Sequence, residues 1–196
     1  MPDPDPDAPT RAPGRLYWLD MEMTGLDLRT CVIIEVAAIV TDMELNEIAE
    51  YEAVVRQPPE ALASMDSWNT RTHTKSGLAA EVPAGRELDD VETDLVALAD
   101  AHFPDERVVL CGNSIGQDKA FVDAYMPRFA ERLHYRVIDV SSFKELFTRK
   151  WPGVAFKKQQ DHRALGDIRE SIGELAYYLS GITEPKAGAA GQEAGG

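Results

Sequence analysis

Several features are scarce in this 196-residue sequence, and each scarcity excludes a class of protein. Only two cysteines are present, Cys31 and Cys111, which are too few for a disulfide framework and lack the spacing of a metal site. Each lies beside apolar residues, which predicts reduced, buried thiols. No stretch approaches the roughly 20 apolar residues of a membrane span, and the N-terminus lacks the basic and apolar regions of a signal peptide. We therefore expect a cytoplasmic protein that makes no contact with a membrane.

Basic residues are also scarce, since 20 Lys and Arg stand against 34 Asp and Glu and the net charge is −14. This balance argues against binding long nucleic acids through a general basic surface. The segment from Lys119 to Arg169 is the exception, with 11 basic and 6 acidic residues. An acidic body with one basic region fits a short anionic substrate that is held locally.

The two ends of the chain contain little that could be buried. Residues 1–14 alternate Pro with Asp and Ala, and residues 182–196 are rich in Gly and Ala. We expect both ends to be disordered tails. Between them, residues 15–181 are long and apolar enough to form one domain with a sizeable core.

The segment Arg15-Leu-Tyr-Trp-Leu-Asp-Met-Glu-Met-Thr-Gly25 carries the first chemical signal. Its aromatic and aliphatic residues predict a strand that ends at Thr24-Gly25. Asp20 and Glu22 are two apart, so they project from the same face of that strand. Two adjacent carboxylates repel each other unless a divalent cation such as Mg²⁺ or Mn²⁺ lies between them. On this pattern alone, the simpler interpretation is that the two carboxylates lie on a solvent-exposed edge face and bind nothing.

The remaining apolar patterns predict a chain that begins with three consecutive strands, and hence a sheet with an antiparallel start. Ser142 and Glu145 have capping-box spacing, which predicts that a helix begins there. The second and third of these strands are expected at 32–41 and 48–56, and two later strands at 108–111 and 135–140. Helices are expected at 60–69, at 88–102, from about 117, at 142–151 and at 164–180.

Three polar or aromatic residues have ordinary structural explanations. Glu35 interrupts an apolar strand and is expected to make a structural polar contact, and His73 is assigned no chemical role. Trp68, within the polar segment 65–74, could anchor that segment in the core. It could instead be exposed and stack on a nucleobase, because every base offers a π-face.

Asp118 and Asp167 fall near the starts of predicted helices. Negative charge is favoured at a helix N-terminus, so Asp118 needs no function. Alternatively, it reaches the face of Asp20 and Glu22 from the end of a neighbouring strand, where sites gather in α/β sheets. His162 and Asp167 are five apart and can converge only if His162 lies before the last helix or at its frayed start.

These residues amount to four carboxylates and one imidazole. Four carboxylates can hold two divalent metals roughly 4 Å apart, a pair that stabilises the attacking and leaving oxygens of an in-line displacement at phosphorus. A neutral imidazole with a pKa near 6.5 can accept a proton from the attacking water around neutral pH. The set predicts phosphodiester hydrolysis.

The order Asp-x-Glu, Asp, His-x₄-Asp is similar to that of the DEDDh exonucleases, and the wider sequence resembles the oligoribonuclease family. The resemblance covers about Arg15 to Ser180. Each matching segment is a weak signal by itself, but together the segments are very specific for this family. Gly166 stands where relatives often have a second Asp, but no position that the chemistry needs is missing. The matching segments are Trp18–Asp27, Met65–His73, Cys111–Asp118, His134–Arg136, Asp139–Ser141, Asp167–Ser171 and Glu174–Tyr178.

The resemblance implies an α/β, RNase H-like (exonuclease) fold with a central mixed five-stranded sheet flanked by helices. It implies a 3′→5′ exoribonuclease that hydrolyses very short RNA, 5′-phosphorylated dinucleotides in particular, with two divalent metal ions, Mg²⁺ or Mn²⁺. The implied catalytic residues are the metal ligands Asp20, Glu22, Asp118 and Asp167 and the general base His162. The implied substrate contacts are Leu26 and Trp68 on the bases and Ser114 and Gln117 at the terminal phosphate end.

The resemblance also implies a homodimer in which Tyr135 and Arg136 reach the partner's site. An Arg that caps a terminal 5′ phosphate would explain a preference for very short substrates, because its planar fork binds phosphate through two hydrogen bonds.

Two alternatives remain at the level of sequence. Another DEDDh exonuclease, acting on longer single-stranded RNA or DNA, shares the five catalytic positions. A non-catalytic binding module could hold a metal in the acidic cluster only to brace its fold. A nucleotide-binding protein of the Walker type is excluded, because no Gly-rich phosphate loop is present.

Overall fold

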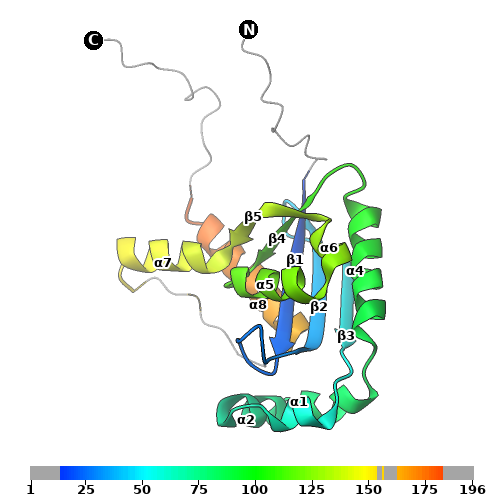
Figure 1. The fold of residues 1–196 in the computed structure, drawn as a ribbon. Coiled ribbons are helices and arrows are strands. Elements are labelled where there is room, and N and C mark those ends of the chain that lie inside the picture. The colour runs from blue at the N-terminus through cyan, green and yellow to red at the C-terminus, as the bar shows by residue number, and fades with distance from the viewer. Residues whose placement is uncertain (1–13, 154–155, 157–162, 183–196) are drawn as a thin grey trace, which may run out of the picture.

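The computed structural model describes residues 14–153, 156 and 163–182. Its centre is a five-stranded sheet of order β3-β2-β1-β4-β5 (Figure 1). β1 (Arg15–Met23), β2 (Ile33–Asp42) and β3 (Glu47–Val54) pair antiparallel, and β4 (Val108–Gly112) and β5 (Leu133–Asp139) run parallel to β1. The mixed five-stranded sheet and its antiparallel start confirm the predicted fold class.

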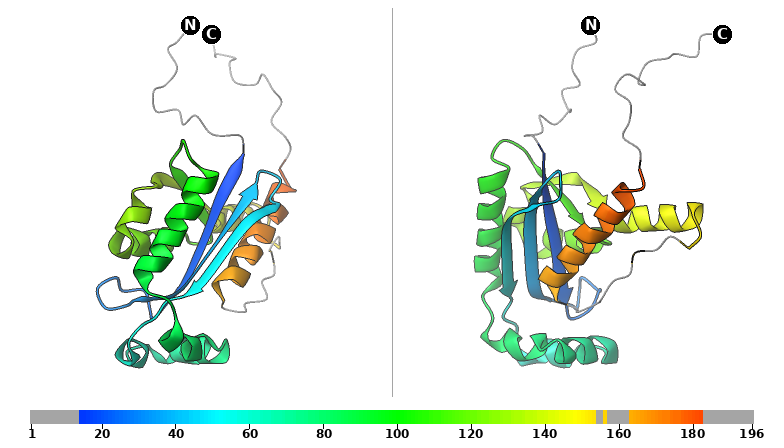
Figure 2. Two further views of the ribbon diagram at one scale, coloured as in Figure 1. Left: turned by 90° about the vertical axis from the view of Figure 1, so that its right-hand side faces the viewer. Right: turned by 180° about the vertical axis from the view of Figure 1, so that it is seen from behind.

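Helices cover both faces of the sheet (Figures 1 and 2). α4 (Leu88–His102), α5 (Gly116–Tyr125) and α6 (Pro127–Ala130) pack on one face, and α8 (Ala164–Leu179) packs against β1 and β2 on the other. α7 (Val140–Lys150) follows β5 directly and packs on α8. α1 (Pro59–Ala63), α2 (Ser67–Lys75) and α3 (Leu78–Glu81), followed by the 3₁₀ turn η1 (Val82–Ala84), lie beyond the end of the sheet where β1 finishes.

The two faces of β1 divide the core. Tyr17, Leu19, Met21 and Met23 join the side chains of α4, α5 and α6. The alternate residues Leu16 and Trp18 face the other side of the sheet and pack against α8 and α7. Their partners there are Ile168, Ile172, Leu175 and Val140. Asp20 and Glu22 alternate in step with Leu16 and Trp18, so the strand delivers them to the edge of the α8 layer.

β1 and β4 pair over a short distance only. Their register runs through Tyr17↔Leu110 and Trp18↔Cys111, after which β4 ends at Gly112. A Cβ at Gly112 would lie 2.8 Å from the Leu19 carbonyl oxygen, so this close approach requires glycine. Beyond it the strands separate and leave the later backbone groups of β1 to other partners.

Three local predictions were wrong. The helix expected at 60–69 is two helices, α1 and α2, because Asp66 accepts hydrogen bonds from the backbone N–H groups of Trp68 and Asn69 and starts a new helix. The capping box at Ser142 does not form, since Asp139, three residues earlier, caps α7 by accepting a hydrogen bond from the Ser141 N–H. Both cysteines are free thiols, but only Cys111 is buried, because Cys31 lies in the loop before β2.

The two predicted tails, 1–14 and 182–196, fall almost entirely outside the described residues, and their disorder stays a prediction. Among the residues that the structure describes, no helix is both long and apolar enough to cross a membrane.

Candidate active site

Three carboxylates meet where β1 ends and α8 begins. Asp20, Glu22 and Asp167 each place one carboxylate oxygen within 4.8 Å of the others, and all three side chains are partly exposed. Asp167 stands in the first turn of α8, which the apolar stripe of that helix holds against β1 and β2. Hard carboxylate oxygens at this separation form a donor set suited to Mg²⁺ or Mn²⁺.

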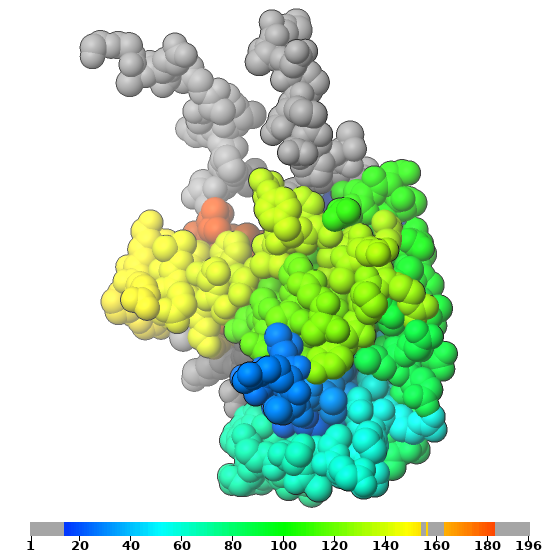
Figure 3. All heavy atoms as spheres, viewed as in Figure 1, coloured from blue at the N-terminus to red at the C-terminus, as the bar shows by residue number. Residues whose placement is uncertain are grey.

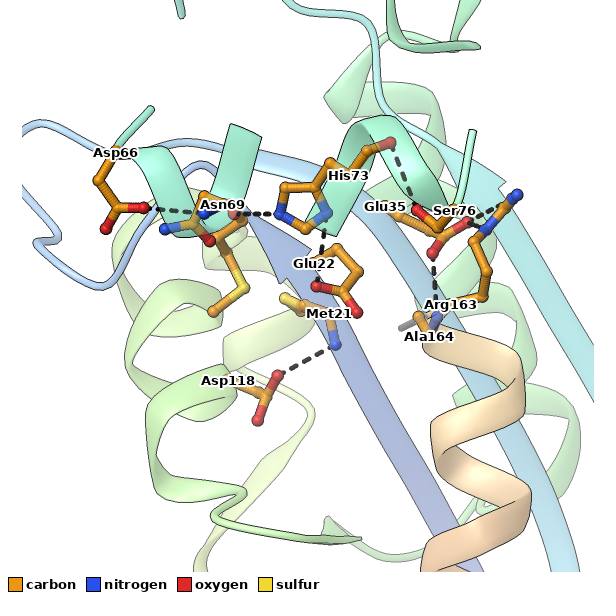
Figure 4. A network of polar contacts seen from close by, with 11 residues as sticks. Met21, Glu22, Glu35, Asp66, Asn69, His73, Ser76, Asp118, Arg163 and Ala164 are labelled. Carbon is orange, nitrogen blue, oxygen red and sulfur yellow. Dashed lines mark hydrogen bonds and ion pairs between the residues drawn. The ribbon is translucent and has the colours of Figure 1, made fainter. Parts of the chain in front are cut away.

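Asp118 approaches the same strand end from the opposite side. It lies in the first turn of α5, is 5% exposed, and accepts a hydrogen bond of 3.1 Å from the Met21 backbone N–H (Figure 4). That N–H is available because β4 has already ended. Within the described part of the chain, the group of mutually close carboxylates leaves out Asp118, although its charge is near enough to raise the pKa of Glu22.

Without a cation, this cluster holds its acidic protons tightly. Burial, and then the charges of Asp167, Glu35 and Asp118, raise the pKa of Glu22 to about 8, against the opposing effect of Arg163. Burial raises the pKa of Asp118 to about 7, although hydrogen bonds such as that from the Met21 N–H lower it. A divalent cation would supply the positive charge that these carboxylates lack, so the residues present fit a metal.

We expect metal binding to release protons. At pH 7 the Glu22 carboxyl, with its pKa of about 8, is mostly protonated and must ionise to bind a cation. Calorimetric titration with Mg²⁺ in two buffers of different ionisation enthalpy should show close to one proton released from Glu22 at pH 7 and far less at pH 9. Equal release at both pH values would contradict the raised pKa.

The same shift fixes the sign of a stability effect. The folded, metal-free protein holds a proton on Glu22 that the unfolded chain loses near pH 4.5. Its contribution to the free energy of unfolding is therefore complete below pH 4.5 and is lost as the pH rises through about 8. Mg²⁺ should offset this loss by stabilising the ionised form.

His73 is a neighbour of the site to which the sequence assigned no role. It is fully buried in α2, with Nε2 3.2 Å from the Met23 carbonyl oxygen and Nδ1 4.0 Å from a carboxylate oxygen of Glu22 (Figure 4). The helix expected at 60–69 stops before His73, so nothing in the polar segment 65–74 indicated that His73 faces the sheet. Read as a helix capped by Asp66, the same segment turns His73 toward the sheet.

The candidate substrate contacts lie around the strand end on separate elements. Gln117, in the first turn of α5, donates a hydrogen bond of 3.2 Å to the Leu26 carbonyl and so links α5 to the loop between β1 and β2. The side chains of Leu26 and Trp68 are 68% and 56% exposed, and therefore available for stacking. On the surface, this loop, drawn blue, lies between the cyan helices α1 and α2 and the green α5 (Figure 3).

Ser114 occupies the turn between β4 and α5. Its φ of 52° is in the left-handed region, where a non-glycine residue is strained. Its N–H donates to the Asp139 carboxylate at 2.9 Å, and the same oxygen caps α7. The turn is thus fixed to the start of α7.

Tyr135 and Arg136 lie apart from the carboxylates, on the edge strand β5. The Tyr135 ring is 74% exposed, stacks on His134 at 4.5 Å, and lies 5.2 Å from the Arg136 guanidinium. His162, the candidate base, lies outside the described residues.

Comparison with known proteins shows which families this chain resembles. Residues 17–175 match the RNase T family, described as exonuclease. Oligoribonucleases of Aliivibrio fischeri and Vibrio campbellii are 48% and 52% identical over 171 and 175 residues, which are 85% of this chain and 94% of each relative.

Solved structures agree in fold. Exonuclease I of Methylocaldum szegediense superposes with a TM-score of 0.59 at 20% identity, over 86% of this chain and 40% of that protein. The zinc-bound form of the E. coli exonuclease I complex with single-stranded DNA gives a TM-score of 0.64 at 14% identity, over 87% of this chain and 41% of that protein. The chain spans about two fifths of these larger enzymes, whereas it matches the oligoribonucleases over nearly their whole length. The chain therefore belongs to the oligoribonuclease family of exonucleases.

Proposed function

We propose that this chain is a 3′→5′ exoribonuclease that hydrolyses very short oligoribonucleotides, above all 5′-phosphorylated dinucleotides, to mononucleotides. The observation that carries the proposal is the convergence of Asp20, Glu22 and Asp167 at the end of β1, with Asp118 on the adjoining side, in a chain of this family. Both cysteines are free thiols, in keeping with action in the reducing cytoplasm.

The four carboxylates would hold two divalent ions, Mg²⁺ or Mn²⁺. Such ions supply Lewis acidity to the scissile phosphate and stabilise the attacking and leaving oxygens. Asp20, Glu22 and Asp167 provide oxygens on the α8 side of β1, and Asp118 provides its own from α5. His162 would accept the proton of the attacking water, since a neutral imidazole titrates in the required range.

Substrate recognition is assigned to the side chains around this end of the strand. Leu26 and Trp68 are exposed and would pack on the two bases of a dinucleotide, where stacking is tolerant of sequence. Ser114 and Gln117, on the turn and first helical turn after β4, would contact the terminal phosphate end.

The test is hydrolysis of 5′-phosphorylated RNAs two to seven nucleotides long, with Mg²⁺, with Mn²⁺ and with chelator. Fast, metal-dependent loss of the dinucleotide, falling steeply with length, is the expected result. Flat length dependence, or equal rates on long single-stranded DNA, would instead identify a polymer-degrading DEDDh enzyme. Absence of turnover in every metal would leave a metal-braced binding module.

We also propose that the enzyme is a homodimer in which Tyr135 and Arg136 serve the partner's site. The exposed Tyr135 ring, which contacts His134 and Arg136 on the edge strand β5, offers an aromatic surface that a second subunit could cover. Arg136 would cap the terminal 5′ phosphate from across the interface and so limit substrate length.

Tyr135→Ala is expected to lower kcat/KM for the dinucleotide about 10- to 100-fold, the usual effect of losing an interfacial aromatic contact. Mixing the Tyr135→Ala protein with an Asp20→Ala protein tests whether Tyr135 acts in the partner's site or in the site of its own chain. Heterodimers of the two variants contain one intact site, so random reassortment should restore about a quarter of the wild-type sites. A monomer in sedimentation, fully active after the Tyr135 substitution, would overturn the dimer proposal.

A further inference from the structure

A second buried carboxylate lies beside the candidate metal ligands. Glu35, on β2, is opposite Glu22 in the antiparallel register of β1 and β2, so both side chains project from the same face. Glu35 is completely buried, whereas Glu22 is partly exposed. Two carboxylates in this arrangement require a positive charge or several hydrogen-bond donors close by.

Arg163 and the start of α8 provide those donors. The Arg163 Nε donates to Glu35 at 2.8 Å, and a terminal guanidinium nitrogen lies 2.7 Å from the same oxygen. The other Glu35 oxygen accepts a 2.9 Å hydrogen bond from the backbone N–H of Ala164, the first residue of α8 (Figure 4). A carboxylate on the central sheet thus caps a helix that begins almost 130 residues later.

Arg163 also contacts α3, one of the helices beyond the end of the sheet. Its guanidinium bridges from Glu35 to Glu81 at the end of α3, with contacts of 3.3 and 3.1 Å. One planar fork therefore joins β2, α3 and the N-terminus of α8. The Arg163 carbonyl then accepts the Asp167 N–H at 3.0 Å, which places Asp167 one helical turn from the anchored residue.

We propose that Glu35 and Arg163 are positioning residues for the metal centre. By fixing the first turn of α8 to β2, they set the distance of the Asp167 carboxylate from Asp20 and Glu22. Neither residue needs to touch substrate or metal to act in this way. The activity measurement below rests on the proposed function. The metal-affinity measurement does not, because it reports the placement of Asp167 whether or not the protein hydrolyses RNA.

A merely structural ion pair would behave differently from a positioning pair. Arg163→Met alone leaves Glu35 buried without its cation, so it tests stability and position together. The double variant Glu35→Gln, Arg163→Met removes both charges and with them the cost of an unpaired buried carboxylate. If the pair positions Asp167, this double variant regains thermal stability but not metal affinity or turnover.

Arg169→Met is the matched control. Arg169 belongs to the same helix, two residues beyond Asp167, and also joins α8 to the sheet through a carboxylate, Glu47 on β3, at 3.0 Å. Arg169 also pairs with Glu50 of β3, and all three side chains are exposed; none of these contacts involves Arg163 or Ala164 at the start of α8. We expect Arg169→Met to remove these ion pairs without changing metal affinity or kcat.

The experiment measures Tm, Mn²⁺ binding by electron paramagnetic resonance, and kcat and KM for a 5′-phosphorylated dinucleotide in the wild type and each variant. In the double variant we expect near-wild-type Tm, Mn²⁺ affinity and kcat each reduced about 10- to 100-fold, and little change in KM. Arg163→Lys, which keeps the charge but loses the fork, should recover part of the kcat.

Wild-type Mn²⁺ affinity and kcat in the double variant would overturn the inference, as would equal losses in Arg169→Met. If the wild type does not hydrolyse the dinucleotide, the proposed function fails. The positioning role would still be supported by a loss of Mn²⁺ affinity confined to the Glu35 and Arg163 variants.

Discussion

Asp167→Ala is expected to reduce hydrolysis of the dinucleotide by about 10³-fold or more, because a catalytic metal contributes several kcal/mol and each ~1.4 kcal/mol is tenfold in rate. The substitution removes one of three carboxylates whose oxygens lie within 4.8 Å of one another. It should weaken Mg²⁺ and Mn²⁺ binding in parallel. Calorimetry and single-turnover hydrolysis on the same preparation measure both effects.

The structure also predicts that Asp167→Ala will not destabilise the metal-free protein. Its charge is among the causes that raise the pKa of Glu22, so removing it relieves repulsion in the cluster. Asp123→Asn is the matched control, because Asp123 is an exposed carboxylate on α5 that pairs with Lys119. Retention of metal affinity in Asp167→Ala, or comparable losses in Asp123→Asn, would remove Asp167 from the metal site.

His162→Ala is expected to separate chemistry from metal binding. Loss of a general base lowers kcat about 10²- to 10⁴-fold, while the four carboxylates and their cations are left in place. The pH dependence should change as well. Wild-type kcat should fall as the pH drops through the range in which an imidazole becomes protonated, and the variant should lack that acidic limb.

His102→Ala provides the control for this second experiment. His102 ends α4 and contacts Arg15, at the opposite end of β1 from the carboxylates. Its substitution should leave kcat and its pH profile unchanged. Equal activity in the wild type and His162→Ala would exclude His162 from proton transfer, and loss of Mn²⁺ binding in His162→Ala would assign it a ligand role instead.

Much of the site could be predicted because it depends on local periodicity. The two-residue spacing of Asp20 and Glu22 fixes a shared face, and the apolar stripe of the last helix orients Asp167 in its first turn. Glu35 was expected to make a structural contact, and it does. Its partner, Arg163, lies 128 residues away, and no local pattern could have identified it.

The remaining parts depend on how distant elements meet. Asp118 binds the Met21 N–H only because β1 and β4 separate after Gly112, a consequence of strand lengths and of one close approach. His73 escaped notice because the polar composition of α2 obscured a helix that is started by one capping residue, Asp66. In both cases the decisive contact joins segments about 50 to 100 residues apart.

The docking of α8 on β1 and β2 has a consequence for biosynthesis. The strands made first leave Leu16, Trp18, Ala37 and Ile39 without cover until the last helix arrives. The same helix brings Asp167, so closure of the core and completion of the metal centre are one event. A chain still being translated would therefore lack the third carboxylate of the metal site until α8 has formed and docked on the sheet. In a refolding experiment followed by hydrogen exchange, the amides of α8 should therefore become protected at the same time as the enzyme becomes active.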